Sequence, residues 1–314
     1  MDKEIYKLPH EFLNRLKQIY PFLYTEICQS FLHKKKQCFR INYLKTDLKS
    51  LRQLLKVENI KAFELNWPPG AFILKSSMRR FQNTSIYKGG TVYVQNISSM
   101  IPPLVLSVSR EDKILDLCAA PGAKTTQIAS LVDRNTEVIA VEKIRTRYYK
   151  LLTNLKIQGA NFVRTLLLDG VLIRKKFVEY FDKILLDVPC SSEGRFYIKN
   201  PRSFKYWKYR KIKEMAHKQK RLFSSAYHTL KPGGILVYST CTFSPEENEE
   251  VVDWALNKFK DALYLLPIEI PLKNIKEGLI KWGNKKFSHS LKLTRRIIPN
   301  SSMEGFFIAC FKKA

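Results

Sequence analysis

Residues 113–132 read KILDLCAAPGAKTTQIASLV: a short apolar strand, a loop of small residues and a helix follow one another directly. Two further segments with helical periodicity occupy residues 145–160 and 208–230. Four more apolar strands alternate with the helices, at residues 137–143, 161–169, 181–188 and 234–241. Strands that alternate with helices form a parallel sheet covered on both faces. The sequence therefore predicts an α/β fold built on a doubly wound, Rossmann-like sheet.

The first part of the chain does not follow this alternation. Helical periodicity at residues 11–23, a strand at 38–45 and scattered turn residues indicate a small α+β domain. We expect two packed units without a flexible linker, at residues 1–91 and 92–314. The apolar segment 305–313 is expected to be a final strand at an antiparallel edge, and a capping box is expected at Ser244, Pro245 and Glu247.

The loop after the first strand is suited to approach a ligand closely. Its small residues let backbone amides reach a bound group, and ligands of doubly wound sheets bind beyond the carboxyl ends of the strands. The spacing matches neither a P-loop nor GxGxxG. Glu142 can accept hydrogen bonds from ribose hydroxyls, and Asp169 can face an adenine amino group. The pattern predicts a nucleoside ligand without pyrophosphate, namely S-adenosylmethionine.

Two thiols end neighbouring strands, Cys190 after the fourth strand and Cys241 after the fifth, and Asp187 precedes the first of them. Carbon 5 of cytosine is a poor nucleophile. A thiolate that adds to carbon 6 makes carbon 5 nucleophilic enough to accept a methyl group, while an acid stabilises charge at ring nitrogen 3. The alternative is that both thiols are small buried hydrophobic residues, the usual state of free cysteine.

Five motifs follow one another along the second part of the chain. They read LDLCAAPGAKT (115–125), VIAVEK (138–143), DKILLDVPCSSEGRF (182–196), LKPGGILVYSTCTFSPEENEEVV (230–252) and GFFIACFKK (305–313). Two further segments precede them, FRINYLK (39–45) and YVQNISSM (93–100). Together they resemble the RNA 5-methylcytosine methyltransferases of the NOL1/NOP2/Sun (RsmB/RsmF-like) family, from about residue 38 to the end of the chain. The resemblance implies that the N-terminal unit is a domain of an RNA-binding type.

The resemblance implies a role for each matching residue. Cys241 would be the nucleophile on cytosine, Cys190 would assist product release, and Asp187 would lie near both the base and the cofactor. Lys124 would reach the base or Asp187, and Arg40 and Asn42 would face the RNA. The residues implied to hold S-adenosylmethionine are Cys118, Ala119, Ala120, Pro121, Gly122, Ala123, Lys124, Glu142, Asp169 and Asp187.

Three positions depart from the family pattern. Ala123 and Ser192 stand where glycine is common, and Asn300 stands where a histidine often follows the proline. None of them is a proposed catalytic group.

A formal net charge of +27 suits a polyanionic partner, and RNA is the expected one. Basic and aromatic residues interleave in residues 196–213, where Lys199, Arg202 and Lys205 can follow phosphates. Phe204, Tyr206 or Trp207 are the candidates for stacking on a base. A solvated basic helix face remains the other interpretation of this segment. The basic stretch at residues 33–40 is likewise either an RNA contact or an ordinary charged turn.

Composition excludes several other classes of protein. No pair of the six cysteines has CxxC spacing and only five histidines occur, so no metal site is expected. The start of the chain has no apolar signal segment and no run is long enough for a membrane helix, which indicates a cytoplasmic protein with free thiols. We expect a monomer.

Two rival functions remain open from the sequence. One is another methyltransferase, acting on DNA cytosine or on an exocyclic amine; the Pro-Cys at 189–190 and the additional Cys241 argue against it. The other is a non-catalytic RNA-binding or assembly factor with a vestigial site. The RNA itself, transfer or ribosomal, is not decided by the sequence.

Overall fold

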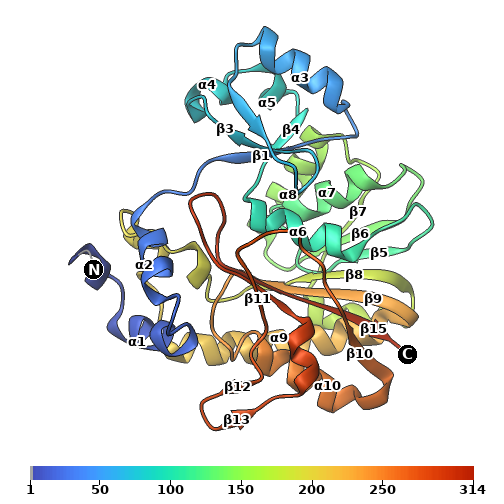
Figure 1. Ribbon diagram of the computed structural model, residues 1–314. Helices are drawn as coiled ribbons and strands as arrows, with labels where there is room; N and C mark the ends of the chain where they lie inside the picture. Colours follow the sequence, from blue (N-terminus) through green and yellow to red (C-terminus); the bar gives the residue numbers. More distant parts are fainter. Residues whose placement is uncertain (1–2) are drawn as a thin grey trace.

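Two β-sheets organise the computed structural model, which describes residues 3–314 (Figure 1). The larger sheet has nine strands, and five consecutive strands that end at one edge run parallel in the order β9-β8-β5-β6-β7. These five strands are β5 (Ile114–Asp116), β6 (Val138–Glu142), β7 (Arg164–Leu167), β8 (Phe181–Asp187) and β9 (Leu230–Thr240). All five were expected from the alternating pattern, with ends shifted by a few residues. The strand order reverses at β5 and β8, which is where ligands bind in such sheets.

The other four strands of this sheet are antiparallel to their neighbours. β15 pairs with β9 along one edge, and with β14 and β10 along the other. The final strand therefore lies inside the sheet, and the expectation of an edge strand at 305–313 was wrong. The four strands are β10 (Leu263–Leu266), β11 (Ile275–Glu277), β14 (Arg295–Ile297) and β15 (Phe306–Lys313).

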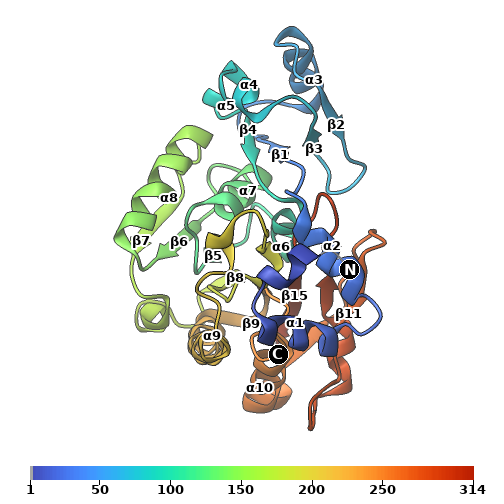
Figure 2. The ribbon, with the colours of Figure 1, turned by 90° about the vertical axis from the view of Figure 1, so that its left-hand side faces the viewer.

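Helices cover both faces of the large sheet, as Figures 1 and 2 show. One face packs against α6 (Ile97–Leu106), α7 (Ala123–Leu131) and α8 (Arg145–Gln158). The other packs against α9 (Tyr209–Thr229), α10 (Glu249–Phe259) and the short helix η2 (Gly170–Lys175). The prediction of a doubly wound α/β domain is confirmed.

The smaller sheet has the order β2-β3-β1-β4 and lies at the top of Figure 1 with its three helices. Phe39, Phe72 and Phe81 stack in its separate hydrophobic core. It extends past the predicted boundary at residue 91, because β4 follows that residue. Its elements are β1 (Cys38–Ile41), α3 (Leu48–Val57), β2 (Ala62–Glu64), β3 (Ala71–Leu74), α4 (Met78–Gln82), α5 (Ser85–Lys88) and β4 (Val92–Val94).

The first helices pack on the large domain and not on the small sheet. α1 (His10–Ile19) and α2 (Tyr24–Leu32) follow η1 (Lys3–Lys7) and share a core with Phe196, Trp207 and Phe243. The predicted N-terminal unit thus contains two separately packed parts; its residues 1 and 2 lie outside the described residues. The remaining short elements are η3 (Glu193–Arg195), η4 (Pro201–Ser203), η5 (Lys260–Ala262), β12 (Lys281–Trp282), β13 (Lys285–Lys286) and η6 (His289–Leu293).

Within residues 3–314, no helix is both long and apolar enough to cross a membrane. The same residues contain no group of three or more His, Cys, Asp or Glu side chains arranged to hold a metal ion.

Candidate active site

A cavity of about 480 Å³ opens at the carboxyl ends of β5, β8 and β9, and its volume is in the range of small-molecule sites. Both thiols expected at these strand ends border it. The cavity is lined by Tyr93, Val94, Gln95, Asn96, Ser99, Cys118, Ala120, Pro121, Ala123, Lys124, Arg147, Asp187, Val188, Pro189, Cys190, Ser192, Arg195, Cys241, Glu304 and Phe306.

The two sulfur atoms lie 3.3 Å apart, although their residues are 51 positions apart in the chain. The backbone amide of Cys241 donates to the sulfur of Cys190 over 3.4 Å, and the Cys241 sulfur lies 3.5 Å from Ser192 Oγ. The loop after β8 is therefore tied directly to the end of β9. The structure brings both predicted catalytic thiols to one cavity wall.

The surroundings of the two thiols shift their pKa values in opposite directions. The hydrogen bond from Cys190 lowers the pKa of Cys241, and the Arg195 guanidinium and Ser192 add to this effect against the cost of burial. The hydrogen bond to Cys241 and burial both raise the pKa of Cys190. Cys241 is thus the better thiolate, while Cys190 remains a thiol that can donate to it.

A short network orients Asp187 towards the cavity. Lys124 Nζ lies 2.7 Å from Asp187 Oδ2 and donates to Ser99 Oγ over 2.8 Å. Ser239 Oγ donates to the other carboxylate oxygen over 2.7 Å. Lys124 is buried, and its neighbour Phe306 packs under the ammonium. The lysine predicted to reach either the base or Asp187 thus contacts Asp187.

The loop predicted to hold the cofactor begins α7, with Gly122 in a left-handed conformation at φ +105°. Cys118, Ala120, Pro121, Ala123 and Lys124 border the large cavity. Ala119 borders a smaller adjoining cavity formed by the same loop, and Gly122 borders neither. The small side chains leave room for a ligand next to the loop.

Glu142 is the last residue of β6 and Asp169 follows the adjacent strand β7, but neither borders the cavity. Glu142 Oε1 accepts from the amide of Ile144, and its other oxygen lies 3.6 Å from Arg147. Asp169 pairs with Lys143 at 2.6 Å and caps η2. A nucleoside cofactor needs a carboxylate that accepts from its ribose hydroxyls and space beside a loop of small residues. The buried Glu142 carboxylate at the end of β6 and the cavity at the end of β5 supply these two features. The residues fit S-adenosylmethionine; the contacts of Glu142 and Asp169 with it stay predictions.

The loops that carry Cys190 and Cys241 are held together where the backbone of Gly194 approaches those of Cys241 and Gly305. Gly194 donates its amide to Cys241 O over 3.0 Å, and Gly305 donates to Gly194 O over 3.1 Å. A Cβ atom at Gly194 would lie 2.1 Å from Gly305 O, so any larger residue there would separate the two segments. The start of β15 is thereby joined to both cysteine loops.

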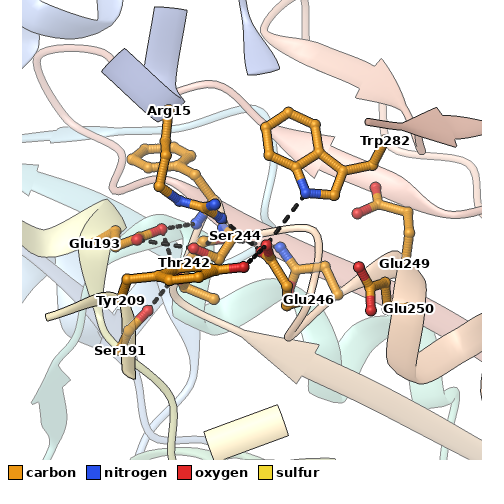
Figure 3. Close-up of polar contacts among 12 residues, drawn as sticks. Arg15, Ser191, Glu193, Tyr209, Thr242, Ser244, Glu246, Glu249, Glu250 and Trp282 are labelled. Carbon is orange, nitrogen blue, oxygen red and sulfur yellow. Dashed lines mark hydrogen bonds and ion pairs between the residues drawn. The ribbon is translucent and has the colours of Figure 1, made fainter. Parts of the chain in front are cut away.

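Glu193 joins the same loops through its side chain, as Figure 3 shows. Its carboxylate accepts from Thr242 Oγ1 at 2.7 Å and from Ser244 Oγ at 2.8 Å. The amide of Phe243 and the indole of Trp207 donate to it as well, at 3.0 and 2.8 Å. Ser244 is therefore not the predicted N-cap, because its hydroxyl is used by Glu193.

Glu246 anchors the segment after Cys241 to the first helix (Figure 3). Arg15 Nη2 of α1 lies 2.6 Å from Glu246 Oε2, and the guanidinium is flanked by the rings of Tyr209 and Trp282 at 4.6 and 5.4 Å. Trp282 Nε1 donates to Glu246 over 3.2 Å. The N-terminal helix is thus part of the support of the site.

Glu247, expected to close a capping box, holds the Cys190 loop instead. Its Oε2 accepts from the amide of Ser191 at 3.0 Å and from Gln219 Nε2 at 2.8 Å, and Gln219 also donates to Pro189 O. α10 begins later, with Asn248 before it. The capping-box prediction was wrong, because the side chains of Ser244 and Glu247 are both used by the loops of the site.

Burial, reinforced by the charge of Glu193, raises the pKa of Glu247 from 4.5 to about 8, and its Oε1 has no hydrogen-bond partner among the described residues. Between these values the folded state holds a proton that the unfolded chain releases. We therefore expect the free energy of unfolding to fall between pH 5 and 8, by up to about 1.4 kcal/mol per pH unit. Glu247→Gln should flatten this slope in urea unfolding at pH 5.5, 6.5 and 7.5.

The matched control for Glu247→Gln is Glu111→Gln, which removes an exposed carboxylate. It should retain the wild-type slope. An unchanged slope in Glu247→Gln would show that this carboxyl is ionised in the folded protein.

The two residues predicted to face RNA from the first strand are buried, and that prediction was wrong. Arg40 donates to Gln95 Oε1 and Thr126 Oγ1, each at 2.8 Å, and Asn42 donates to Gly90 O and Gln158 O, each at 2.8 Å. Both side chains are less than 5% exposed. They join the small sheet to α7 and α8, so their polar groups are occupied by protein.

The basic residues of the second candidate segment are placed differently. Lys199, Arg202 and Lys205 are exposed, as an RNA contact requires. Of the three aromatic candidates for stacking, Tyr206 is 75% exposed, whereas Trp207 is buried against Glu193. Their contact with RNA stays a prediction.

Sequence reasoning missed Arg195 and Glu304, which line the cavity on the side of Cys241. Arg195 Nε lies 3.5 Å from Glu304 Oε2, and burial raises the pKa of this carboxyl. Arg195 stands inside the motif DKILLDVPCSSEGRF, and Glu304 directly precedes the motif GFFIACFKK. The position of Arg195, five residues after Cys190, was the available signal for the arginine.

Comparison with known proteins places this geometry in a family. Residues 103–312 match the family model of the 16S rRNA methyltransferase RsmB/F, and residues 8–97 match that of the N-terminal domain of 16S rRNA methyltransferase RsmF. The chain belongs to the RsmB/F methyltransferase family. The identification made from the motifs is confirmed: the protein is an S-adenosylmethionine-dependent RNA cytosine-5 methyltransferase.

Two curated relatives of this RsmB/F family member act on different RNAs. The chain is 39% identical over 287 residues to the tRNA (cytosine(49)-C(5))-methyltransferase of Pyrococcus abyssi, covering 90% of each chain. It is 35% identical to ribosomal RNA small subunit methyltransferase F of Pectobacterium carotovorum, covering 98% of this chain but 63% of that protein. The structure of a methyltransferase homologue from Pyrococcus horikoshii superposes over the full length of both chains, with a TM-score of 0.87 and 29% identity.

Proposed function

We propose that this methyltransferase modifies carbon 5 of a cytosine in tRNA through a covalent adduct with Cys241. The observation that carries the mechanism is the convergence of the Cys190 and Cys241 sulfurs on one cavity with the Lys124–Asp187 pair. The relative named as a tRNA methyltransferase, similar over 90% of both chains, supports the choice of RNA.

The first step is addition of the Cys241 thiolate to carbon 6 of the base. The lowered pKa of this thiol supplies the anion, and the electron pair of the ring double bond moves towards carbon 5 and ring nitrogen 3. Ring nitrogen 3 takes up a proton from solvent as the thiolate adds. The Asp187 carboxylate, held by Lys124 and Ser239, faces the cavity where it can accept a hydrogen bond from that N–H. Bound S-adenosylmethionine supplies an electrophilic methyl group.

The second step is release of the product. Loss of the carbon 5 proton to a base restores the ring double bond and expels the Cys241 sulfur as a thiolate. Cys190, whose raised pKa keeps it a thiol, can donate a hydrogen bond to that departing sulfur across 3.3 Å. Cys241 therefore forms the bond to carbon 6, and Cys190 assists the breaking of that bond.

A base inside an RNA helix cannot reach these sulfurs, so the target must leave its stack. Single-stranded loops and helix ends make this step less costly. Exposed Lys199, Arg202 and Lys205 stand beyond the Cys190 loop, where they can contact the phosphates that flank the target.

The test is incubation of the purified protein with labelled S-adenosylmethionine and either tRNA transcripts or 16S rRNA, followed by digestion to nucleosides. We expect labelled 5-methylcytidine from tRNA, at a single position in bisulfite sequencing. The match of residues 8–97 to the N-terminal domain of an rRNA methyltransferase makes rRNA the second candidate. Label in rRNA alone would reverse the choice of substrate, and label in neither RNA would contradict the proposal.

A further inference from the structure

A second cavity, of about 360 Å³, lies away from the thiols on the outer side of α9 and α10. Both helices run beneath the large sheet in Figure 1, and η2 completes the rim of the cavity. Five of its eight lining residues are cationic or imidazole side chains. The cavity is lined by Val171, Arg174, His217, Lys220, Arg221, Ser224, Trp254 and Lys258.

Trp254 holds two of these cations in place. Lys258 Nζ lies 4.9 Å from the indole centroid and Lys220 Nζ lies 5.8 Å from it, and Lys258 also donates to the buried Ser224 hydroxyl over 3.2 Å. Cations ordered against an aromatic face lose little further entropy when an anion binds between them. The cavity is thus a preorganised arrangement of donors.

The positive charge of this cavity is not neutralised by its own lining, which contains no carboxylate. The charges of Glu250 and Asp253 reach Lys220, but both acids have other partners: Glu250 pairs with Lys285 at 2.7 Å, and Asp253 accepts from the amide of Ser288 at 2.9 Å. These cations also act on neighbouring His228: burial lowers its pKa most, Arg174, Lys313 and Lys258 lower it further, and Glu179 opposes them. Like charges held together favour a bound anion.

A basic track links this cavity to the edge of the active site. Tyr209, at the start of α9, contacts the Glu246 cluster, and Gln219 of the same helix holds the Cys190 loop. From Tyr209 to Arg221 the helix covers about 18 Å. The exposed basic side chains before and along this stretch are Lys199, Arg202, Lys205, Lys208, Arg210, Lys211, Lys213, His217 and Arg221.

We propose that this cavity binds a backbone phosphate of the RNA substrate, in an arm outside the loop that carries the target cytosine. The inference rests on the proposed function, because RNA is the polyanion that the enzyme must already hold. None of the eight residues that line this cavity lines the cavity of the thiols, so a phosphate bound here belongs to a nucleotide other than the target. The cavity therefore favours RNAs with a flanking helical arm over isolated loops.

The test variant is Arg174→Gln combined with Arg221→Gln, two exposed side chains without ion pairs among the described residues. We expect the KM for full-length tRNA to rise about tenfold with kcat unchanged, and the slope of log KM against log salt to fall by one to two. A short stem-loop that carries the target should show the same KM with variant and wild-type enzyme. Lys281→Gln with Lys286→Gln, on the β12–β13 hairpin, is the charge-matched control.

Nitrocellulose retention of labelled tRNA measures binding without turnover, so the cavity is tested even if methylation of that RNA fails. Weaker retention by the cavity variant alone supports the proposal. Equal KM and equal retention for the variant and the wild type overturn it. Inhibition of methylation by inorganic phosphate is measured in parallel for the wild type and the variant. If the variant loses this inhibition but binds tRNA as the wild type does, the proposal is also overturned, because the site would then bind free phosphate and not RNA.

Discussion

Cys190→Ala should accumulate a protein–RNA adduct that survives denaturation, whereas Cys241→Ala should form none and lose turnover by roughly 10³-fold or more. The reason is the arrangement of the sulfurs, which lie 3.3 Å apart with opposite shifts in pKa. Removing the Cys241 sulfur removes the covalent bond. Removing the Cys190 thiol leaves the nucleophile but deletes the group that donates to it as it departs.

The measurement is a denaturing gel after incubation with labelled tRNA and S-adenosylmethionine, read beside the yield of 5-methylcytidine. Cys310→Ala is the matched control, since Cys310 is a buried cysteine of β15 that lies opposite Val237 of β9 and does not line the cavity. It should behave as the wild type. Adduct of equal amount in both active-site variants would remove the assignment, and adduct in Cys241→Ala alone would reverse it.

The large sheet was predictable because each of its parallel strands is marked by residues within or next to that strand in the sequence. The parallel strands β5, β6 and β8 are short, largely buried apolar runs, and each is bounded by a helix or a turn signal. The chemistry was predictable for the same reason. Functional residues of such sheets stand at strand ends, so locating the strands also located Asp187, Cys190 and Cys241.

Arg40 and Asn42 were not predictable, because their partners are distant in sequence. Arg40 lies on a strand whose four residues are all buried, and it is satisfied by Gln95 and Thr126, 55 and 86 positions away. Burial without an acid lowers the pKa of Arg40 to about 9, and four hydrogen bonds compensate for the lost hydration. An arginine in a basic segment gives no sign of such an environment.

The acidic segment after Cys241 was also interpreted wrongly, because the partners of its side chains are distant in sequence. SPEENEE reads as a helix start, and local capping rules favour that interpretation. In the structure Glu246 binds Arg15, Glu247 binds the Cys190 loop, and Glu249 forms a buried ion pair with Arg296 at 2.6 Å. Three acids of one short segment thus fasten the end of β9 to three other parts of the chain. In a protein of net charge +27, such a cluster of acids is itself the signal that was available.

Asp187→Asn should lower kcat by about 10²- to 10⁴-fold while the chain stays folded. The amide has the shape of the carboxylate and can still accept from Ser239. It cannot carry the charge that stabilises a protonated ring nitrogen, and it deprives the buried Lys124 ammonium of its anionic partner at 2.7 Å. Both losses affect the adduct more than the bound substrate, so the KM for RNA should change only a few-fold.

The matched control is Asp182→Asn, at the opposite end of the same strand. Asp182 pairs with Lys231 at 2.7 Å and accepts from the amide of Lys113, away from the cavity. Single-turnover methylation of tRNA measures the chemical step, and the pH profile separates a lost acid from a disturbed fold. A rate for Asp187→Asn within a few-fold of the control would assign the charge at nitrogen 3 to another residue. The Lys124 ammonium, freed from its partner, would then be the group that contacts the base, since Lys124 also borders the cavity.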